Sequence, residues 1–342
     1  GGIPPLPASL HPLGLLARRS LPRLRQRVRD RARERGPLIA GLVVEQTRTR
    51  ESMPARRYLP LICYLLASRS ALGLNLATAL AAIAPGYDVT PCDFEHRRLI
   101  IVRHGAVSPE AHDPPLRNDA VYGGTYNVPL SGEGRREAAT IASLVAAAHG
   151  HEVRHLFASP LAMQSGKLIA EAVSPLVVGG LQVVAAPLLA DIDRGAWNGL
   201  TVKEIEALWG PEAFERCATE ADYGRDVVGG EGIATLRGRT LAMRDSVLRA
   251  TRPGTASVLC THKWVARQIL AEALGQIEDH GAQIPVPTAS ISVLDFPDGT
   301  WPLDLTAALE ERGAFFHQER STPLVRAVGF KPDDFSKSGL IR

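Results

Sequence analysis

Two histidines each follow directly on a short apolar segment of the kind that forms a buried strand. His104 comes after residues 98–103 (RLIIVR), and His262 comes after residues 257–261 (SVLCT). If both segments are parallel strands of one sheet, their carboxyl ends meet at the edge where open α/β sheets bind ligands. A neutral imidazole can accept a phosphoryl group, while guanidinium and imidazole groups stabilise the charge on its oxygens. With Arg103 beside His104, this pair of histidines predicts a site for phosphoryl transfer.

Phosphoryl transfer from an ester also needs a carboxylic acid, because the leaving oxygen must take up a proton. The histidines and the arginine by themselves do not say which carboxylate of the chain provides this proton.

Five segments, taken in order, resemble the histidine phosphatase superfamily, to which the phosphoglycerate mutases belong. They are LIIVRHG (99–105), YGGTYNVPLSGEGRREA (122–138), FASPL (157–161), LLADIDRGAWNGLT (188–201) and SVLCTH (257–262). The resemblance covers residues 96–300 and implies a phosphoglycerate-mutase-like fold, an α/β protein with a mostly parallel central sheet and helices on both faces. It implies that His104 is the nucleophile that accepts the phosphoryl group and that Asp191 is the acid. Asp193 is the neighbouring carboxylate, which would point the same way in an extended segment, but the family pattern favours Asp191. Arg103 and His262 are implied as residues of the phosphate pocket, with His262 also in the catalytic set.

The sequence departs from the family pattern where a second phosphate-binding arginine is usual, two residues after the Ser-Pro-Leu at residues 159–161. Met163 stands there, and a thioether offers neither a positive charge nor a strong hydrogen-bond donor. Lys167 lies one helical turn later and is one candidate for a replacement cation. A lysine would supply a point charge rather than the planar fork of a guanidinium.

Two further departures concern the acid and the second histidine. Asp191 stands where the family usually has a glutamate, so its carboxylate sits on a side chain one methylene shorter. Lys263 follows His262 where the family usually has a glycine, which would let the backbone approach a phosphate closely. Lys263 either crowds the pocket, which we expect, or supplies the positive charge that Met163 lacks.

The regions between these motifs alternate between apolar, strand-like runs and helical periodicity. We expect strands at residues 98–103, 153–159, 182–185, 257–261 and 289–296. We expect helices at residues 131–149, 160–173, 201–209, 231–249 and 263–274. This alternation favours a mostly parallel sheet that is covered by helices on both faces.

The chain divides into an N-terminal extension (residues 1–95), a domain of the catalytic type (96–300) and a C-terminal tail (301–342). Residues 1–29 contain several arginines and no acidic residue, which resembles a mitochondrial transit peptide. A solvated basic tail is the alternative. We therefore expect a mitochondrial location, with a cytoplasmic location as the alternative.

One apolar stretch of the extension, residues 61–84, has about the ~20 residues that are needed to cross a bilayer. Arg69 within it would cost about 2.5–3.5 kcal/mol near the bilayer centre. We therefore expect a helix that docks on a protein surface. A helix at the membrane interface and a membrane span are the alternatives.

Composition narrows the range of partners. The net charge of +3 is too small to indicate nucleic acid as the main partner. The four cysteines are far apart and form no CxxC pair, and no cluster of ligands has the spacing of a metal site. We therefore expect neither a metal ion nor a cofactor.

Two functions remain open. The departures at Met163 and Lys263, together with the long extensions, favour a catalytically weak or silent accessory or scaffold subunit of a larger, mitochondrial assembly. Such a subunit would bind protein partners through residues 1–95 and 301–342. The alternative is an active phosphomonoesterase or phosphomutase, which acts on a phosphate-bearing small molecule through a phosphohistidine at His104. The expected fold is the same for both functions.

Overall fold

The computed structural model describes residues 87–117, 119–220, 223, 227–298 and 322–332. The basic segment at residues 1–29 and the apolar stretch at residues 61–84 lie outside these described residues. Within the described part, none of the helices combines the length and the apolar character that a membrane span needs. No group of three or more His, Cys, Asp or Glu side chains in the same part is arranged to hold a metal ion.

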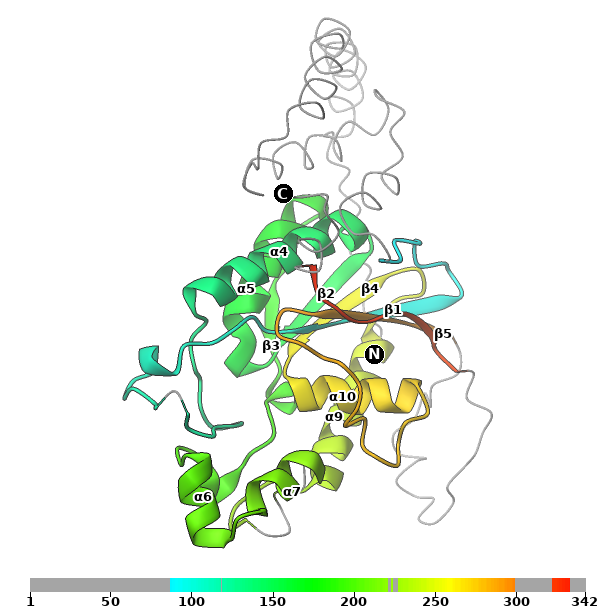
Figure 1. Ribbon diagram of the computed structural model, residues 1–342. Coiled ribbons are helices and arrows are strands. Elements are labelled where there is room, and N and C mark those ends of the chain that lie inside the picture. Colours follow the sequence, from blue (N-terminus) through cyan, green and yellow to red (C-terminus); the bar gives the residue numbers. More distant parts are fainter. Residues whose placement is uncertain (1–86, 118, 221–222, 224–226, 299–321, 333–342) are drawn as a thin grey trace, which may run out of the picture. The chain divides into compact units, whose positions relative to one another are not determined.

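A six-stranded sheet forms the centre of the described part, with the strand order β3-β2-β4-β1-β5-β6 (Figure 1). Its strands are β1 (His96–Arg103), β2 (Val153–Ala158), β3 (Val183–Ala185), β4 (Ala256–Thr261), β5 (Ile291–Pro297) and β6 (Leu324–Phe330). Strands β3, β2, β4 and β1 are parallel, whereas β5 is antiparallel to β1, and β6 is antiparallel to β5. The predicted α/β fold with a mostly parallel sheet is therefore confirmed, and its antiparallel pairs lie at one edge.

Helices cover both faces of this sheet (Figure 1). On one face lie α4 (Gly132–His149) and α5 (Met163–Val173), and on the other lie α9 (Ile233–Ala250) and α10 (Lys263–Ala273). Two shorter helices, α6 (Val202–Trp209) and α7 (Ala213–Glu220), precede α9 in the chain. Helix α7 was not predicted from the sequence, and the helix expected at residues 160–173 is divided into a separate 3-10 turn at Pro160–Ala162 and α5.

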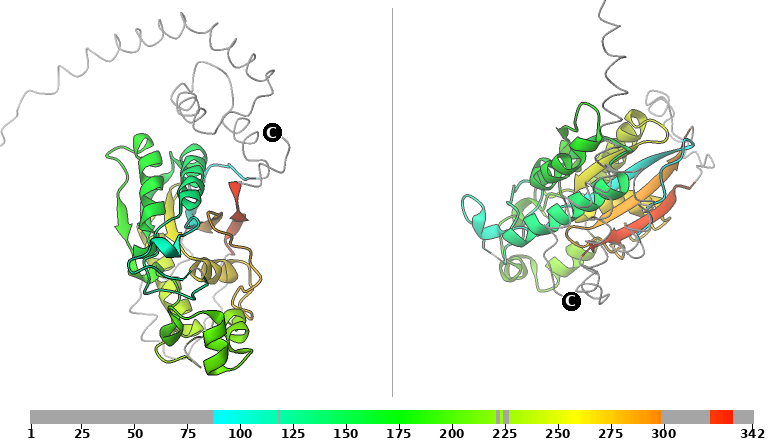
Figure 2. Two further views of the ribbon diagram at one scale, coloured as in Figure 1. Left: turned by 60° about the vertical axis from the view of Figure 1, so that its left-hand side comes forward. Right: turned by 90° about the horizontal axis from the view of Figure 1, so that it is seen from above.

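Residues 324–330 require a correction, because the sequence analysis assigned them to a tail outside the fold. They form β6 beside β5, as the cyan, orange and red strands of Figure 2 show in the right-hand view. The Nε of Arg326 donates to Oδ2 of Asp295 at 2.9 Å, and the Oγ of Ser292 accepts from the N–H of Gly329 at 2.8 Å. An edge strand is only half-buried, so its sequence carries a weak apolar pattern. The strand is therefore identified by its pairing with β5 in the structure rather than by its sequence.

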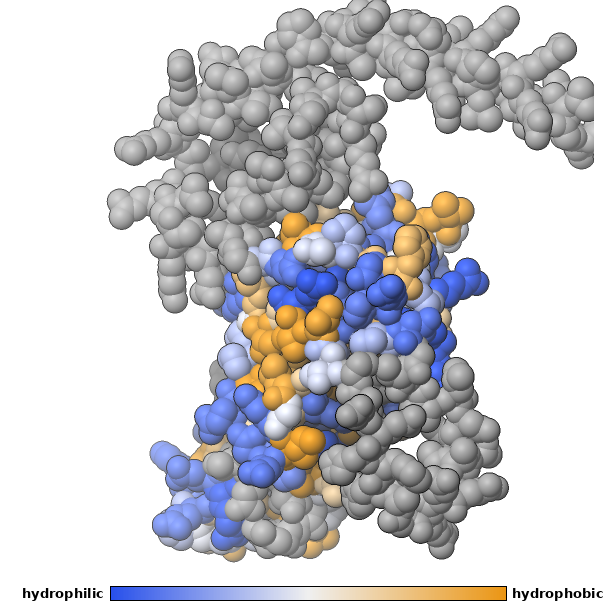
Figure 3. Space-filling view, turned by 90° about the vertical axis from the view of Figure 1, so that its right-hand side faces the viewer, coloured by the Kyte–Doolittle hydropathy of each residue, from blue (hydrophilic) through white to orange (hydrophobic). Residues whose placement is uncertain are grey.

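The surface of the described part is not uniformly polar. Figure 3 shows a band of apolar side chains between hydrophilic ones on one face. On the edge strand β6, the side chains of Leu324 and Val325 are exposed. Scattered apolar residues are ordinary on protein surfaces, whereas contiguous apolar patches often mark interaction sites.

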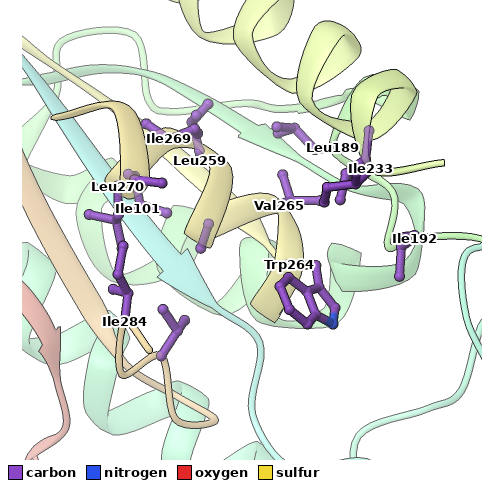
Figure 4. Close-up of a cluster of buried hydrophobic side chains, with 14 of the residues drawn as sticks. Ile101, Leu189, Ile192, Ile233, Leu259, Trp264, Val265, Ile269, Leu270 and Ile284 are labelled. Atoms are coloured by element: carbon purple, nitrogen blue, oxygen red, sulfur yellow. The ribbon is translucent and has the colours of Figure 1, made fainter. Parts of the chain in front are cut away.

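The sequence of the central strand β1 is apolar without alternation because both faces of the strand are buried. Leu99 and Ile101 belong to the apolar cluster under α9 and α10, whereas Ile100 and Val102 belong to the cluster under α4 and α5. A strand that is buried on both faces reads as a continuous apolar run. Figure 4 shows part of the first cluster, to which Val265 of α10 also belongs.

The two arginines that bracket the apolar run of β1 have different roles. Arg98, which is 1% exposed, donates from Nε to Asp295 at 2.7 Å and from Nη1 to Glu152 at 3.0 Å. This buried network connects the amino end of β1 to β5 and to the loop before β2. Arg103 lies at the opposite end of the strand, at the edge of the sheet that carries the two histidines.

Candidate active site

The two histidines predicted from the sequence lie next to each other at the carboxyl edge of the sheet. Strands β1 and β4 are parallel neighbours with Arg103 opposite Thr261, so the next residues, His104 and His262, are brought together. Their ring centroids are 4.9 Å apart, and the N–H of His104 donates to the carbonyl of Thr261 at 3.1 Å. The pairing of the two strands thus fixes both imidazoles at the edge where α/β sheets bind ligands.

One ring nitrogen of His104 is available for chemistry. Its Nδ1 lies 2.7 Å from the carbonyl oxygen of Gly105. A carbonyl can only accept, so Nδ1 carries the proton and Nε2 keeps its lone pair. Burial lowers the pKa of His104 below its ordinary value of 6.5, and the charge of Arg103 lowers it further. The imidazole is therefore neutral at pH 7, which is the form that attacks phosphorus.

The turn that carries His104 packs tightly against the first turn of α4. A Cβ on Gly105 would overlap the carbonyl oxygen of Gly134, and a Cβ on Gly134 would overlap that of Ala106. Only glycine allows two backbones to approach this closely. Helix α4 therefore fixes the path of the backbone directly after the histidine.

His262 is the N-cap residue of α10 and is held from the side of the neighbouring strand. Its Nε2 lies 2.8 Å from the Oγ of Ser159, the serine of the Ser-Pro-Leu segment. Burial lowers the pKa of His262 to about 3, although the charge of Asp191 opposes the shift. A neutral His262 that is oriented by Ser159 keeps Nδ1 as the ring nitrogen available to a ligand.

Arg103 brings a guanidinium with unused donors to the same place. Its Nη1 donates to the carbonyl of Val286 at 2.6 Å, while its Nε is buried without a hydrogen-bond partner among the described residues. Its charge contributes to lowering the pKa of both His104 and His262, so the guanidinium lies close to the two rings. This arrangement suits a group that binds phosphate oxygens.

Of the two candidate carboxylates, Asp191 faces the histidines. Its Oδ2 lies 3.6 Å from Nη1 of Arg194, and its Oδ1 is buried without a hydrogen-bond partner in the described part of the chain. Burial raises the pKa of Asp191, but the charge of Arg194 lowers it and the pKa is lowered overall. Asp191 is therefore ionised at pH 7 and has one oxygen free to interact with a ligand.

Asp193, in contrast, stabilises the turn that follows it. Its Oδ1 accepts from the N–H of Gly195 at 2.9 Å and from the side-chain amide of Asn198 at 2.7 Å. These two hydrogen bonds shape the loop, and they leave Asp191 as the candidate acid.

Helix α5 carries both Met163 and the candidate replacement cation Lys167. Met163, the first residue of this helix, is half-buried and packs against the apolar cluster on its face of the sheet. Lys167 is exposed and makes no ion pair or hydrogen bond with a described residue. Lys167 thus lies on the solvent side of α5, and its role in phosphate binding stays a prediction.

Lys263 is half-buried and lies in a different environment. Its Nζ is 5.8 Å from the ring centroid of Trp264. Burial lowers the pKa of Lys263, and the charges of Arg267 and Arg103 lower it further. The ammonium group thus lies among the cations around the histidines. Whether Lys263 crowds the pocket or supplies a positive charge to it stays a prediction.

Arg194 is a site residue that the sequence analysis missed. Its Nη1 faces Asp191 and donates to the carbonyl oxygen of Tyr122, and its Cζ lies 5.4 Å from the ring centroid of Tyr223. Arg194 lies three residues after Asp191 in the segment LLADIDRGAWNGLT, and this position could have identified it. Only the two carboxylates of that segment were considered as site residues. It adds a second guanidinium to the neighbourhood of the candidate acid.

Arg239 of α9 was also missed, because it lies 48 residues from the loop that it holds. Its Nη2 donates to the backbone carbonyl of Asp191 at 3.2 Å, and its Nη1 donates to that of Leu188 at 2.7 Å. The Nε of Arg239 also pairs with Glu231 at 2.6 Å. Arg239 therefore fixes the backbone of the segment that carries the acid.

One protein-family model matches the sequence. It is described as the histidine phosphatase superfamily (branch 1) and matches residues 99–308, which is more than half of the chain. The matched range contains both histidines, both candidate cations at 103 and 263, and the candidate acid. No curated protein matches the sequence.

Several solved structures have a similar fold. Mycobacterial hydrolase 2 is 19% identical, with a TM-score of 0.52, and the match covers 72% of this chain and 98% of that one. A mycobacterial glucosyl-3-phosphoglycerate phosphatase is 21% identical, with a TM-score of 0.46 and coverage of 58% and 89%. YhfR of Bacillus stearothermophilus is 20% identical, with a TM-score of 0.49 and coverage of 60% and 94%. At these identities the likeness is one of fold.

Proposed function

Because the chain belongs to the histidine phosphatase superfamily, we propose that it cleaves phosphate monoesters slowly through a phosphohistidine at His104. The observation that carries this proposal is the state of the His104 ring, which is neutral and anchored through Nδ1 on Gly105. This leaves Nε2 as a nucleophile beside His262. A protein that had lost its chemistry would not need this orientation of the ring.

In the first step the lone pair of Nε2 on His104 forms a bond to phosphorus as the bond from phosphorus to the leaving oxygen breaks. Asp191 gives a proton to that oxygen, so the alcohol leaves neutral. The charge of a bound phosphoryl group raises the pKa of a neighbouring carboxyl, which favours the protonated form that this step requires. In the second step water attacks phosphorus, the N–P bond breaks, Asp191 takes a proton from the water, and inorganic phosphate is released.

The expected rate is low because one charge is missing from the pocket. Arg103 can bind the phosphoryl oxygens, whereas Met163 offers no donor where relatives have an arginine. Loss of one preorganised donor typically costs about 2.7–4 kcal/mol in the transition state. Lys263 offsets part of this loss as a point charge.

Phosphate release from 4-nitrophenyl phosphate by the full chain tests the proposal, with His104→Ala and His104→Gln as controls. We expect slow release by the wild type, together with an acid-labile phosphoryl group on the protein after rapid quenching. Both should disappear in the two variants. Release that persists in both folded variants, or no release by the folded wild type from any phosphate monoester, would contradict the proposal.

A second candidate function is that of an accessory or scaffold subunit. The packing of Met163 in an apolar cluster favours it, because this side chain has a structural use that does not require catalysis. Contiguous apolar surface such as the band in Figure 3 is typical of interaction sites. Protein partners bound through residues 1–95 and 301–342, and a mitochondrial location, belong to this candidate. Affinity purification of the full chain tests it, and partners that remain bound after both segments are deleted would exclude these segments as the binding elements.

A further inference from the structure

The candidate acid has a guanidinium close to its carboxylate in the free chain. Nη1 of Arg194 lies 3.6 Å from Oδ2 of Asp191, and the two side chains are only 16% and 20% exposed. The distance is too long for a hydrogen bond, so the contact is an ionic one, and partial burial strengthens it. Because Oδ1 of Asp191 has no hydrogen-bond partner among the described residues, Arg194 stabilises the negative charge without blocking the carboxylate.

Contacts with two other segments hold the guanidinium of Arg194 in this place. Its Nη1 donates to the carbonyl oxygen of Tyr122, and its Cζ lies 5.4 Å from the ring centroid of Tyr223. Tyr223 is buried and packs edge-on against Trp197, with 5.8 Å between the ring centroids. A carbonyl and an aromatic face orient a guanidinium without neutralising it. The position of Arg194 therefore does not depend on Asp191.

The backbone around Arg194 is also constrained. Arg194 forms an antiparallel bridge with Gly230, and the N–H of Ala196 donates to the carbonyl of Val228 at 2.9 Å. Gly195, between them, has a φ of +54°, and a Cβ there would overlap the backbone of Gly230. Only glycine combines this φ with so close an approach. The fold thus sets where the guanidinium lies.

The other titratable groups that face Asp191 contribute less to its charge state. His104 and His262 face it from the ends of β1 and β4, and burial lowers the pKa of both, so both are neutral at pH 7. Burial by itself raises the pKa of Asp191, and the charge of Arg194 is the largest cause that opposes it. The ionised form of this carboxyl therefore depends mainly on Arg194.

The two steps of the proposed reaction require opposite forms of this carboxyl. Transfer to His104 needs a protonated Asp191, because the leaving oxygen takes up its proton. Hydrolysis needs an ionised Asp191, because the carboxylate takes a proton from the attacking water. An opposite charge beside a carboxyl favours the ionised form. Arg194 therefore favours the second step at the expense of the first.

We propose that Arg194 is a positioning residue that keeps Asp191 as the base of the second step, so that the phosphohistidine gives its phosphoryl group to water rather than retaining it for a second hydroxyl. The inference rests on the proposed function for the phosphohistidine. In this step the water oxygen bonds to phosphorus, the electron pair of the N–P bond returns to Nε2 of His104, and Asp191 takes the proton. Arg194 acts through Asp191, and the chain is a phosphatase rather than a phosphomutase.

Rapid mixing of the full chain with 4-nitrophenyl phosphate separates the two steps. The initial burst of 4-nitrophenol reports transfer to His104, and the release of inorganic phosphate reports hydrolysis. We expect Arg194→Met to lower the rate constant of hydrolysis roughly tenfold or more, because loss of an opposite charge typically raises a carboxyl pKa by at least about 1. The phosphohistidine should then accumulate, so that the burst approaches one 4-nitrophenol per chain.

Phenyl phosphate tests the opposite effect on the first step, because its leaving oxygen is more basic and depends more on the acid. Arg194→Met should release the first phenol at least as fast as the wild type, whereas damage to the fold would slow both steps. Arg194→Lys retains the charge and should restore most of the hydrolysis rate. Arg97→Met is the matched control. It removes a guanidinium that is 21% exposed from an ion pair with Asp298 at the opposite edge of the sheet, and it should behave as the wild type.

Two results would overturn the role of Arg194. One is an unchanged ratio of the two rate constants in Arg194→Met, and the other is hydrolysis by Arg194→Lys that is as slow as in Arg194→Met. If the methionine variant fails to fold, Arg194→Gln, which keeps an N–H donor for the Tyr122 carbonyl, replaces it. A phosphohistidine that forms without a change in its partition overturns this role alone. No phosphohistidine in any variant or in the wild type overturns the proposed function, and this inference with it.

Discussion

The Nζ of Lys331, directly after β6, lies 2.7 Å from Oε1 of Glu137 on α4. The other carboxylate oxygen of Glu137 accepts from the N–H of Ala106 at 2.8 Å, two residues beyond His104. Burial raises the pKa of Glu137, but Lys331 and the Ala106 N–H outweigh it, and the pKa is lowered overall. A residue near the end of the described chain thus supports the turn that carries the nucleophile.

Lys331→Met should therefore affect catalysis through the position of His104. We expect kcat to fall by several-fold to tenfold with little change in KM, because the phosphate-binding groups stay in place. Lys331→Arg should restore much of the loss, and Lys203→Met, on exposed surface, should behave as the wild type. Steady-state kinetics of all three variants test this, and a change in KM alone would contradict a positioning role.

Met163→Arg should raise turnover, because it restores a guanidinium at the position that the family uses for phosphate. Transition-state stabilisation of about 2.7–4 kcal/mol corresponds to an increase in kcat of roughly 10²- to 10³-fold. Met163→Leu keeps the apolar packing without the charge and should leave kcat unchanged. Equal rates for the arginine and leucine variants would show that this position does not face the phosphoryl group.

The nucleophile should remain active at pH values where an ordinary histidine is protonated. The pKa of His104 lies below 6.5 because of burial and the charge of Arg103. A base with a lowered pKa stays neutral as the pH falls through 6.5, so the acid limb of the rate profile should lie below that value. Arg103→Met should raise the pKa of His104 and so move the acid limb to higher pH. The same substitution should also lower the maximal rate. Single-turnover rates across the acid range measure both, and identical limbs in the two proteins would contradict the assignment.

His262 should make stability depend on pH. Its pKa is about 3 in the folded chain and about 6.5 when unfolded, so in this window only the unfolded state binds the proton. Above pH 6.5 the titration of His262 therefore does not lower the free energy of unfolding. As the pH falls from 6.5 toward 3, the free energy of unfolding falls by about 1.4 kcal/mol per pH unit. Urea unfolding at pH 7 and pH 5 should show this loss in the wild type and a smaller one in His262→Gln. The same pH dependence in both proteins would exclude a neutral, buried His262.

The sequence by itself determined the parts of this protein that depend on local pattern. Continuous apolar runs that end in His104 and His262 predicted two buried parallel strands, and the carboxyl ends of such strands share one edge of the sheet. The absence of a charge at Met163 is likewise local, because it follows from the chemistry of one side chain. Strand β6 was not predicted, since a half-exposed edge strand has a weak pattern and needs its partner to define it.

Only the tertiary structure decided where the two candidate replacement cations lie. Lys167 was a candidate replacement in the sequence, whereas Lys263 was expected to crowd the pocket. Helix α5 places Lys167 in solvent, while α10 holds Lys263 half-buried near Arg267. Arg239 and Lys331 reach the loops of the acid and the nucleophile from distant segments. Ion pairing and pKa depend on distance and burial, and both are set by packing between residues far apart in the chain.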